Sequence, residues 1–319
     1  MTPQVFSRLI ATPRRVTVAS AIFAAAIVAV VSIESATGEQ PTVEVSRNSL
    51  IDSLRQSFAN ETNFIRIHAA EALVEHGMGD EVAAVLAREA ATAPPITRIG
   101  VWRVLARTSS DPARAGHVAK LRQLLLSDGE PDRIHAAEAL AKLNQTLSDD
   151  REAITRLADE ASPPQSCHPL WLLVLSGDTK AEGRLAGLLD SPDEVARLVA
   201  AYVIGRLSTI SDETRRKLVT VADNEPAWSP ALGYLLAAAT LRGKELFIDQ
   251  RLRFRRRLIE RLKDGSVNER YEAALAIGAT GDLTDLENLQ PLLSQPGDPR
   301  IGAAQGALRI LKRHESQGR

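Results

Sequence analysis

The chain has 319 residues, of which 39 are Lys or Arg and 40 are Asp or Glu, so its formal charge is −1. Hydrophobic residues make up 44% of the chain and there is one cysteine, which excludes an intrinsically disordered protein and a disulfide-stabilised scaffold. A nearly neutral chain also lacks the excess of Lys and Arg that neutralises phosphates, so we expect no nucleic-acid partner.

The beginning of the chain differs from everything after it. Residues 1–15 contain three arginines and no acidic residue, and an uncharged apolar run, VTVASAIFAAAIVAVVSI, follows at 16–33. Eighteen helical residues rise about 27 Å, which is close to the thickness of the hydrocarbon core of a bilayer. We therefore expect a transmembrane helix at 16–33, with residues 1–15 in the cytoplasm and residues 34–319 exported.

Two interpretations of this segment stay open. The apolar run is longer than the about 7–15 residues usual in a signal peptide, which favours a retained signal anchor. Cleavage after Ser32 is the alternative. With the anchor retained, we expect a single-pass protein of the cell membrane whose C-terminal domain is periplasmic or extracellular, with residues 34–44 as a linker.

An internal repeat fills the rest of the chain. The string RIHAAEAL occurs from Arg66 and again from Arg133, and related segments recur about every 33 residues. Three, four and seven positions after each start, almost every residue is apolar, which forms one stripe along an α-helix. The eight starts are Arg66, Arg98, Arg133, Cys167, Arg197, Ser229, Arg270 and Arg300.

Each of these helices follows a second amphipathic stretch, such as HVAKLRQLLL from His117, and turn-forming residues separate the two. A pair of short helices cannot bury its own apolar faces, so it must stack on neighbouring pairs. The sequence predicts an all-α fold: one transmembrane helix, then an α-solenoid of about eight helical pairs over residues 45–314, then a polar tail at 315–319. As an open stack, the pairs would span roughly 70–80 Å.

The pattern resembles the short HEAT-like repeats of phycobilisome lyases and of many bacterial proteins. The resemblance rests on segments such as SPDEVARLVAAYVIGRLS from Ser191 and NERYEAALAIGATGDLTDLENLQPLL from Asn268, and it covers about residues 45–314. It implies an armadillo-type fold with an extended concave surface. Such repeats have many roles, so the resemblance is specific for fold and not for function.

Two H-x-x-E pairs, His68 with Glu71 and His135 with Glu138, could each place two metal ligands on one helix face. HEAT-like deoxyhypusine hydroxylases bind two irons through His-Glu dipeptides, but here Ala follows each histidine. The two pairs also lie two units apart, roughly 20 Å along the stack. We therefore expect no metal and no cofactor, and these four residues become candidates for binding a protein partner.

Arginine begins six of the eight repeats. A guanidinium group suits bidentate contacts with acids or loop carbonyls of a neighbouring unit. We expect such a structural ladder from Arg66, Arg98, Arg133, Arg197, Arg270 and Arg300, with Asp111, Asp132, Asp193 and Asp298 as partners.

A further concentration of positive charge lies in LFIDQRLRFRRRLIERLKDG, from Leu246. Arg255, Arg256 and Arg257 in this segment are candidates for docking an acidic partner or anionic lipid headgroups, and a solvated helix face is the alternative.

No catalytic constellation is evident. Cys167 lies beside His168, but a Cys-His nucleophile also needs spatial pairing and an oxyanion site. We expect a non-enzymatic, membrane-anchored scaffold or adaptor that binds a protein partner of unknown identity through its exported repeat domain. The alternative is a HEAT-fold enzyme or lyase-like chaperone that acts on a modified protein.

Overall fold

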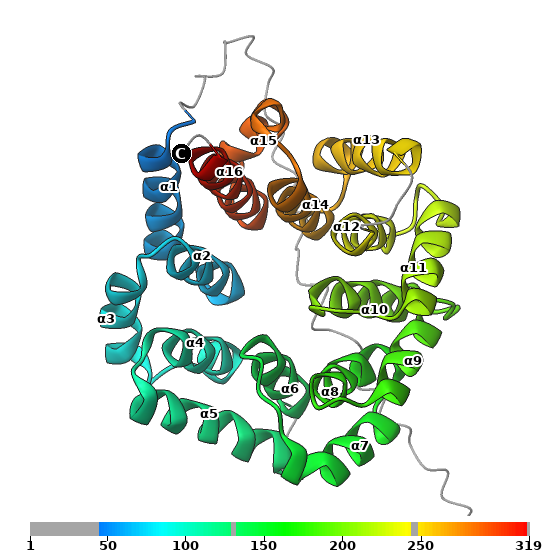
Figure 1. The fold of residues 1–319 in the computed structure, drawn as a ribbon. Helices are drawn as coiled ribbons and strands as arrows, with labels where there is room; N and C mark the ends of the chain where they lie inside the picture. The colour runs from blue at the N-terminus through cyan, green and yellow to red at the C-terminus, as the bar shows by residue number, and fades with distance from the viewer. Residues whose placement is uncertain (1–44, 129–131, 244–247, 318–319) are drawn as a thin grey trace, which may run out of the picture. The chain divides into compact units, whose positions relative to one another are not determined.

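The computed structural model describes residues 45–128, 132–243 and 248–317, which contain sixteen α-helices and no β-strand. The helices alternate between an outer and an inner layer (Figure 1). The outer helices are α1 (Arg47–Asn60), α3 (Gly79–Glu89), α5 (Asp111–Leu126), α7 (Arg151–Glu160), α9 (Thr179–Leu188), α11 (Asp212–Asn224), α13 (Ile248–Asp264) and α15 (Leu286–Leu293). The inner helices are α2 (Asn63–Glu75), α4 (Pro95–Thr108), α6 (Arg133–Lys142), α8 (Pro163–Leu175), α10 (Glu194–Arg206), α12 (Leu232–Arg242), α14 (Val267–Thr280) and α16 (Asp298–Gln317). The expectation of repeated helix pairs is confirmed.

The expected fold class is wrong in its first element, the transmembrane helix. No helix of the described ranges is long and apolar enough to cross a bilayer. The longest, α16, has 20 residues but carries charged side chains along its length. The run at 16–33 lies outside the described residues, as do the ranges 1–15 and 34–44.

Local signals fix where the helices begin and end. Ser46 and Ser266 form capping boxes at the starts of α1 and α14, and proline lies in the first turn of α4, α5 and α8. Gly77 and Gly177, shortly after α2 and α8, have φ of +91° and +84°. Glycine adopts this left-handed conformation without steric cost, so the chain reverses sharply towards the next outer helix.

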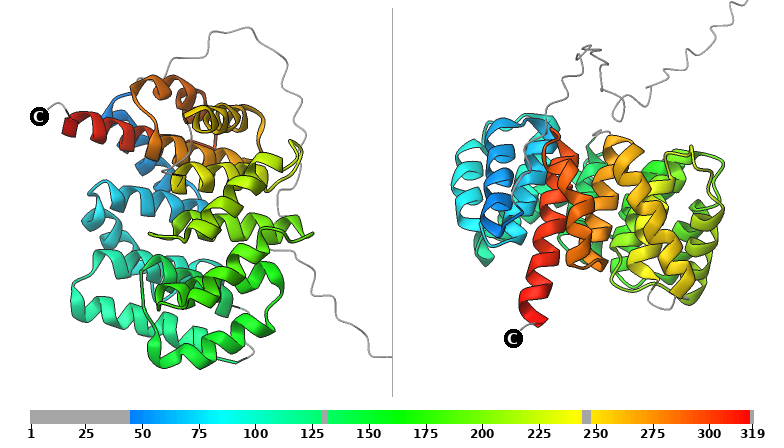
Figure 2. Two further views of the ribbon diagram at one scale, coloured as in Figure 1. Left: turned by 45° about the vertical axis from the view of Figure 1, so that its right-hand side comes forward. Right: turned by 90° about the horizontal axis from the view of Figure 1, so that it is seen from above.

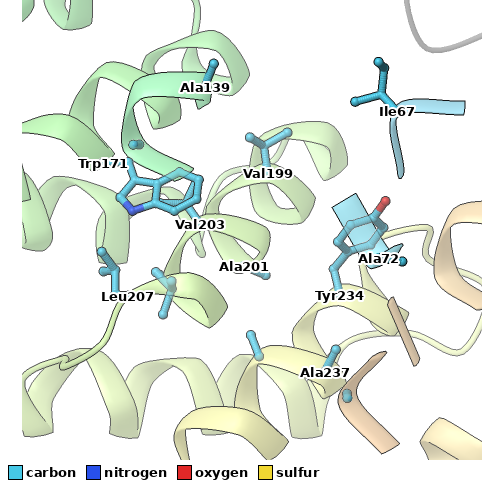
Figure 3. Close-up of a cluster of buried hydrophobic side chains, with 14 of the residues drawn as sticks. Ile67, Ala72, Ala139, Trp171, Val199, Ala201, Val203, Leu207, Tyr234 and Ala237 are labelled. Atoms are coloured by element: carbon cyan, nitrogen blue, oxygen red, sulfur yellow. The ribbon is translucent and has the colours of Figure 1, made fainter. Parts of the chain in front are cut away.

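Small residues let the inner helices approach one another closely. Paired alanines such as Ala136–Ala137 and Ala200–Ala201 are fully buried on the inner helices. At Gly278 in α14, a Cβ atom would lie only 2.2 Å from the Cα of Gly306 in α16. Larger side chains fill the wider gaps, as Trp171 and Tyr234 do among the buried aliphatic residues in Figure 3.

The stack of pairs closes into a ring instead of staying open. Helix α16 packs against α1 and α2, and polar contacts join the two ends (Figure 1). Arg300 Nη2 lies 3.0 Å from Glu61 Oε1, and Arg309 Nε lies 2.6 Å from Glu75 Oε1. Successive pairs turn relative to one another until the circuit closes (Figure 1).

Closure removes the extended concave surface expected for an open stack. The helices stand side by side around a single circuit, and the C-terminal part of α16 projects beyond its neighbours (Figure 2). Helix α16 continues to Gln317 and so includes most of the segment expected as a polar tail.

The close approach of α14 and α16 can be tested with Gly278→Ala. The added methyl group would collide with the backbone at Gly306, so we expect the free energy of unfolding to fall by about 1–3 kcal/mol. Urea denaturation measures the change. Gly183→Ala is the matched control, because nothing lies within 4 Å of a Cβ there. Alanine favours helix α9 by up to about 1 kcal/mol, so the control should be neutral or stabilising. Equal losses in both variants would contradict the close packing.

Candidate functional site

Several inner helices carry polar side chains at matching positions of the repeat. Glu71, Arg103, Glu138 and Tyr202 occupy the same position, five residues after their repeat starts. One helical turn later come Glu75, Arg107, Lys142, Arg206 and Arg309. Several of these side chains form ion pairs or hydrogen bonds between inner helices, both adjacent and non-adjacent ones. We call this set, together with the residues described below that contact it, the central network.

Glu71 on α2 and Arg103 on α4 form the most buried ion pair of the network. Arg103 Nε donates to Glu71 Oε1 at 2.7 Å, and Arg107 Nη1 lies 3.4 Å from the same oxygen. Burial by itself would raise the pKa of the Glu71 carboxyl, but the positive charges of Arg103, Lys142 and Arg107 outweigh burial and lower that pKa. Glu71 is therefore ionised at neutral pH.

Glu138 on α6 joins the network across the ring. The Tyr202 hydroxyl of α10 donates to Glu138 Oε1 at 2.5 Å, and Lys142 Nζ lies 2.9 Å from that oxygen. Burial opposes ionisation of Glu138, yet Lys142, His168 and Arg103 together hold its pKa well below its usual value. Burial raises the pKa of the Tyr202 hydroxyl, and Glu138 adds to the increase, so Tyr202 stays protonated.

The network continues through α14 and α16. Arg206 Nη2 lies 2.8 Å from Glu272 Oε1, and its guanidinium carbon lies 3.5 Å from the centre of the Tyr202 ring. His68 stacks on Tyr271 at 5.2 Å between ring centres, and its Nδ1 lies 2.8 Å from Asp298 Oδ1.

Two further histidines lie beside these groups. The His135 ring centre is 6.3 Å from that of Phe64, and His168 meets Tyr202 edge-on at 6.4 Å. Burial lowers the pKa of His168, and the positive charges of His135, Lys142 and Arg206 lower it further. The negative charge of Glu138 raises it but does not offset these effects, so the pKa is about 4. His168 is thus neutral at physiological pH.

The two H-x-x-E pairs therefore face one network, although they belong to units two apart. From the repeat spacing, the two pairs were expected roughly 20 Å apart along the stack. In the ring, Arg103 donates a hydrogen bond to Glu71, and its positive charge also lowers the pKa of Glu138. Their carboxylates are neutralised by cations, and the described residues contain no group of three His, Cys, Asp or Glu suited to a metal ion.

Sequence reasoning missed Arg103, Tyr202 and Glu272 as members of the network. All three tyrosines of the chain lie on α10, α12 and α14. For Arg103 and Tyr202 the signal was present as a position, five residues after the repeat start, that is polar in several repeats. Which partner each side chain takes depends on the curvature of the ring, which the repeat does not specify.

Cys167 is a residue of the hydrophobic core. It is fully buried, and its thiol donates to the Pro163 carbonyl with 3.6 Å between sulfur and oxygen. Burial raises the pKa of the thiol to about 12. The reactive thiolate is therefore scarce at neutral pH, which does not suit nucleophilic catalysis.

The arginines at the repeat starts connect successive units. Arg197 Nη2 lies 2.7 Å from Glu225 Oε1 of the next unit, and Arg300 contacts Glu61 across the ring closure. Arg133 instead stays within its own pair, where it contacts Asp128 and the Leu125 carbonyl. The remaining contacts are Arg66 with Glu89, Arg98 with Asp132 and Arg270 with Gln295.

Among the acids expected as partners of these arginines, only Asp132 takes that role. Asp193 caps α10 by accepting from the Val195 amide, and Asp298 contacts His68. Asp111 begins α5 and lines a shallow surface depression.

Most arginines of α13 contact neighbouring elements. Arg255 Nη2 lies 2.5 Å from the buried Asp285, and Arg257 donates to the carbonyls of Ala222 and Glu225. Arg256 is exposed and no contact is recorded for it within the described part of the chain. Of the three arginines expected to dock an acidic partner, two therefore hold the fold together.

Two shallow depressions lie on the outer helices, with volumes of about 330 Å³ at α5 and about 720 Å³ at α7. Each is lined mainly by the exposed side of one helix. Neither encloses a small molecule or brings convergent polar groups around one.

Exposed apolar side chains gather at one edge of the ring. All inner helices run in the same direction, because each outer helix returns antiparallel, so their N-termini share one edge, which we call the N-terminal rim. Trp228, next to this rim, is 76% exposed. Of the eight large apolar residues that are exposed in the described part of the chain, four more lie there: Phe64, Leu126, Val195 and Val267. The sequence analysis did not identify this rim, because its residues lie at turns and helix starts.

Comparison with known proteins does not identify a functional site in this chain. No family model and no curated protein matches this chain. Among solved structures, it is similar to an engineered protein from the Northeast Structural Genomics Consortium. The two are 18% identical with a TM-score of 0.34, and the similarity covers 84% of this chain and 79% of the other. A likeness at this level carries no argument about function.

Glu71→Gln tests the central ion pair. The substitution leaves the buried Arg103 guanidinium without a counter-charge, so we expect a loss of about 3 kcal/mol in the free energy of unfolding, measured by urea denaturation. Glu81→Gln is the control, because the Arg55–Glu81 pair is exposed at the outer surface. It should change stability little. Equal effects of the two variants would show that the central pair is not desolvated.

His168 predicts a dependence of stability on pH. Its pKa is about 4 in the folded protein against an ordinary value of 6.5, so the unfolded chain takes up the proton first as pH falls. Between pH 7 and pH 5 this should cost about 2 kcal/mol of unfolding free energy. The His168→Gln variant should lack this fall in unfolding free energy. The control variant His314→Gln, which changes an exposed histidine, should retain it. An unchanged pH dependence in His168→Gln would contradict the prediction.

Proposed function

We propose that the described residues form a HEAT-like ring that acts as a non-enzymatic scaffold for binding another protein. Regular helix pairs and an arginine at most unit starts support the HEAT-like assignment. The observation that carries the function is the gathering of large apolar side chains on the N-terminal rim, above all Trp228. Exposed apolar clusters on a folded surface mark contacts with other proteins.

The central network supports this proposal by its lack of free reactive groups. Glu71, Glu138 and Glu272 each contact a cation, and Cys167 is buried as a neutral thiol. Ionised groups that neutralise one another inside a ring stabilise one arrangement of its helices. Binding is therefore assigned to the rim, and the central network holds the rim in shape.

Affinity capture with the tagged full chain tests the scaffold function. We expect a protein to be enriched in stoichiometric amount over the tag alone, as quantified by mass spectrometry. Phe64→Ser combined with Trp228→Ser should reduce its recovery at least tenfold, because buried aromatic anchors dominate interface energies. Ile248→Ser combined with Leu252→Ser is the control and should leave recovery unchanged, because these two residues are also exposed but lie on α13. Absence of any enriched protein would refute the proposal.

A further inference from the structure

The ring is closed by contacts between its first and last units, and we call this joint the seam (Figure 1). His68 Nδ1 lies 2.8 Å from Asp298 Oδ1, and Glu61 Oε1 accepts from the Gly297 amide at 3.3 Å and from Arg300 at 3.0 Å. Successive units are joined by a loop of the chain, whereas the two sides of the seam are held by noncovalent contacts. Because each unit of a repeat protein packs mainly on its neighbours, the seam can separate without unfolding the units.

The contacts that cross the middle of the ring do not bridge the seam. Tyr202 joins α10 to α6, and Arg206 joins α10 to α14. Neither bond connects the first unit to the last. Separation of the seam would remove His68 from Tyr271 of α14 and would leave these two bonds in place.

A buried histidine, His76, lies at the seam. It follows Glu75, whose carboxylate oxygens lie 2.6 Å from Gln305 Nε2 and 2.6 Å from Arg309 Nε of α16. His76 is only 6% exposed, and neither of its ring nitrogens has a hydrogen-bond partner among the described residues. A buried polar group without a partner costs free energy, and a charged one costs more. Opening of the seam would let water reach both nitrogens.

Cations from both sides of the seam act on His76. Arg47 belongs to α1, and Arg309 and Lys312 belong to α16. Burial lowers the pKa of His76, and these three positive charges lower it further, whereas the negative charge of Glu75 raises it without offsetting them. His76 is therefore neutral at pH 7 while the ring is closed.

These surroundings give the seam a dependence on pH. In the open form His76 is in water and takes up a proton near the ordinary pKa of 6.5, whereas in the closed form it does so only at lower pH. A fall in pH below about 6.5 consequently favours the open form. Protonation of His68 acts in the opposite sense, but its neutral ring can already donate from Nδ1 to Asp298, so the charge adds no new bond.

We propose that the seam is an acid-sensitive gate. Uptake of a proton by His76 places a fourth positive charge beside Arg47, Arg309 and Lys312, which releases α16 from α1 and α2 and opens the ring. The other units stay stacked on one another. The gate goes beyond the proposed scaffold function, because it concerns when the ring is closed and not which protein the ring binds.

Hydrogen–deuterium exchange of the full chain, followed by mass spectrometry, tests the gate. Exchange is compared at pH 7 and pH 5, with labelling times scaled for the intrinsic dependence of amide exchange on pH. After this correction we expect the amides of α1, α2 and α16 to exchange about fivefold faster at pH 5, and those of α6, α8, α10 and α12 to change much less.

Substitutions at Lys312 and His76 separate the gate from a general loss of stability. Lys312 is exposed, so its replacement should leave the fold intact. Lys312→Gln should reduce the acceleration at the seam and Lys312→Glu should reduce it more, whereas Lys312→Arg, which keeps the charge, should retain it. His76→Gln should abolish the acceleration, and His314→Gln, which changes an exposed histidine of α16, should retain it.

Equal acceleration in all helices would indicate global unfolding in acid and would overturn the gate, as would equal exchange of the seam helices at both pH values. An acceleration that persists unchanged in Lys312→Glu would also overturn it, and this variant decides the matter if His76→Gln does not fold. Capture of a protein partner at pH 7 is independent of these outcomes, so the scaffold function and the gate can fail separately.

Discussion

The structure depends on the close approach of its inner helices. Fully buried alanines and the contact of Gly278 with Gly306 let the inner helices pack closely. Each helix pair turns relative to the one before it (Figure 1). Over eight pairs the turns add up to a full circuit, which brings α16 against α1 and α2.

Closure changes what the polar stripe of the inner helices can do. On an open stack those side chains would face water along a concave surface and would be free to contact a partner. In the ring they lose water and meet side chains from across the circuit, so each charge must be neutralised where it lies. This burial raises the pKa of Tyr202 and lowers that of His168, whereas neighbouring positive charges outweigh burial and lower the pKa of Glu138. Trp228, at the N-terminal rim, is by contrast 76% exposed.

Several sequence-based expectations follow local rules and match the structure. Helix pairs, their boundaries at caps and glycines, and the contact of Arg98 with Asp132 are set by residues near one another or in adjacent repeats. The expected transmembrane helix falls on residues outside the described ranges, and no described helix could take its place. The expectation about the two H-x-x-E pairs treated the units as an open stack, whereas in the ring the charge of Arg103 acts on both Glu71 and Glu138.

By itself, the sequence determined that the chain forms repeated amphipathic helix pairs with arginines at the unit starts, since a period of 3.6 residues is a local property. Only the tertiary structure decided that Tyr202 binds Glu138, 64 residues away, and that Arg309 binds Glu75, 234 residues away. It also decided that Trp228 remains exposed on the rim. The reason is that the angle between neighbouring pairs depends on packing, and small differences in that angle accumulate over the whole circuit.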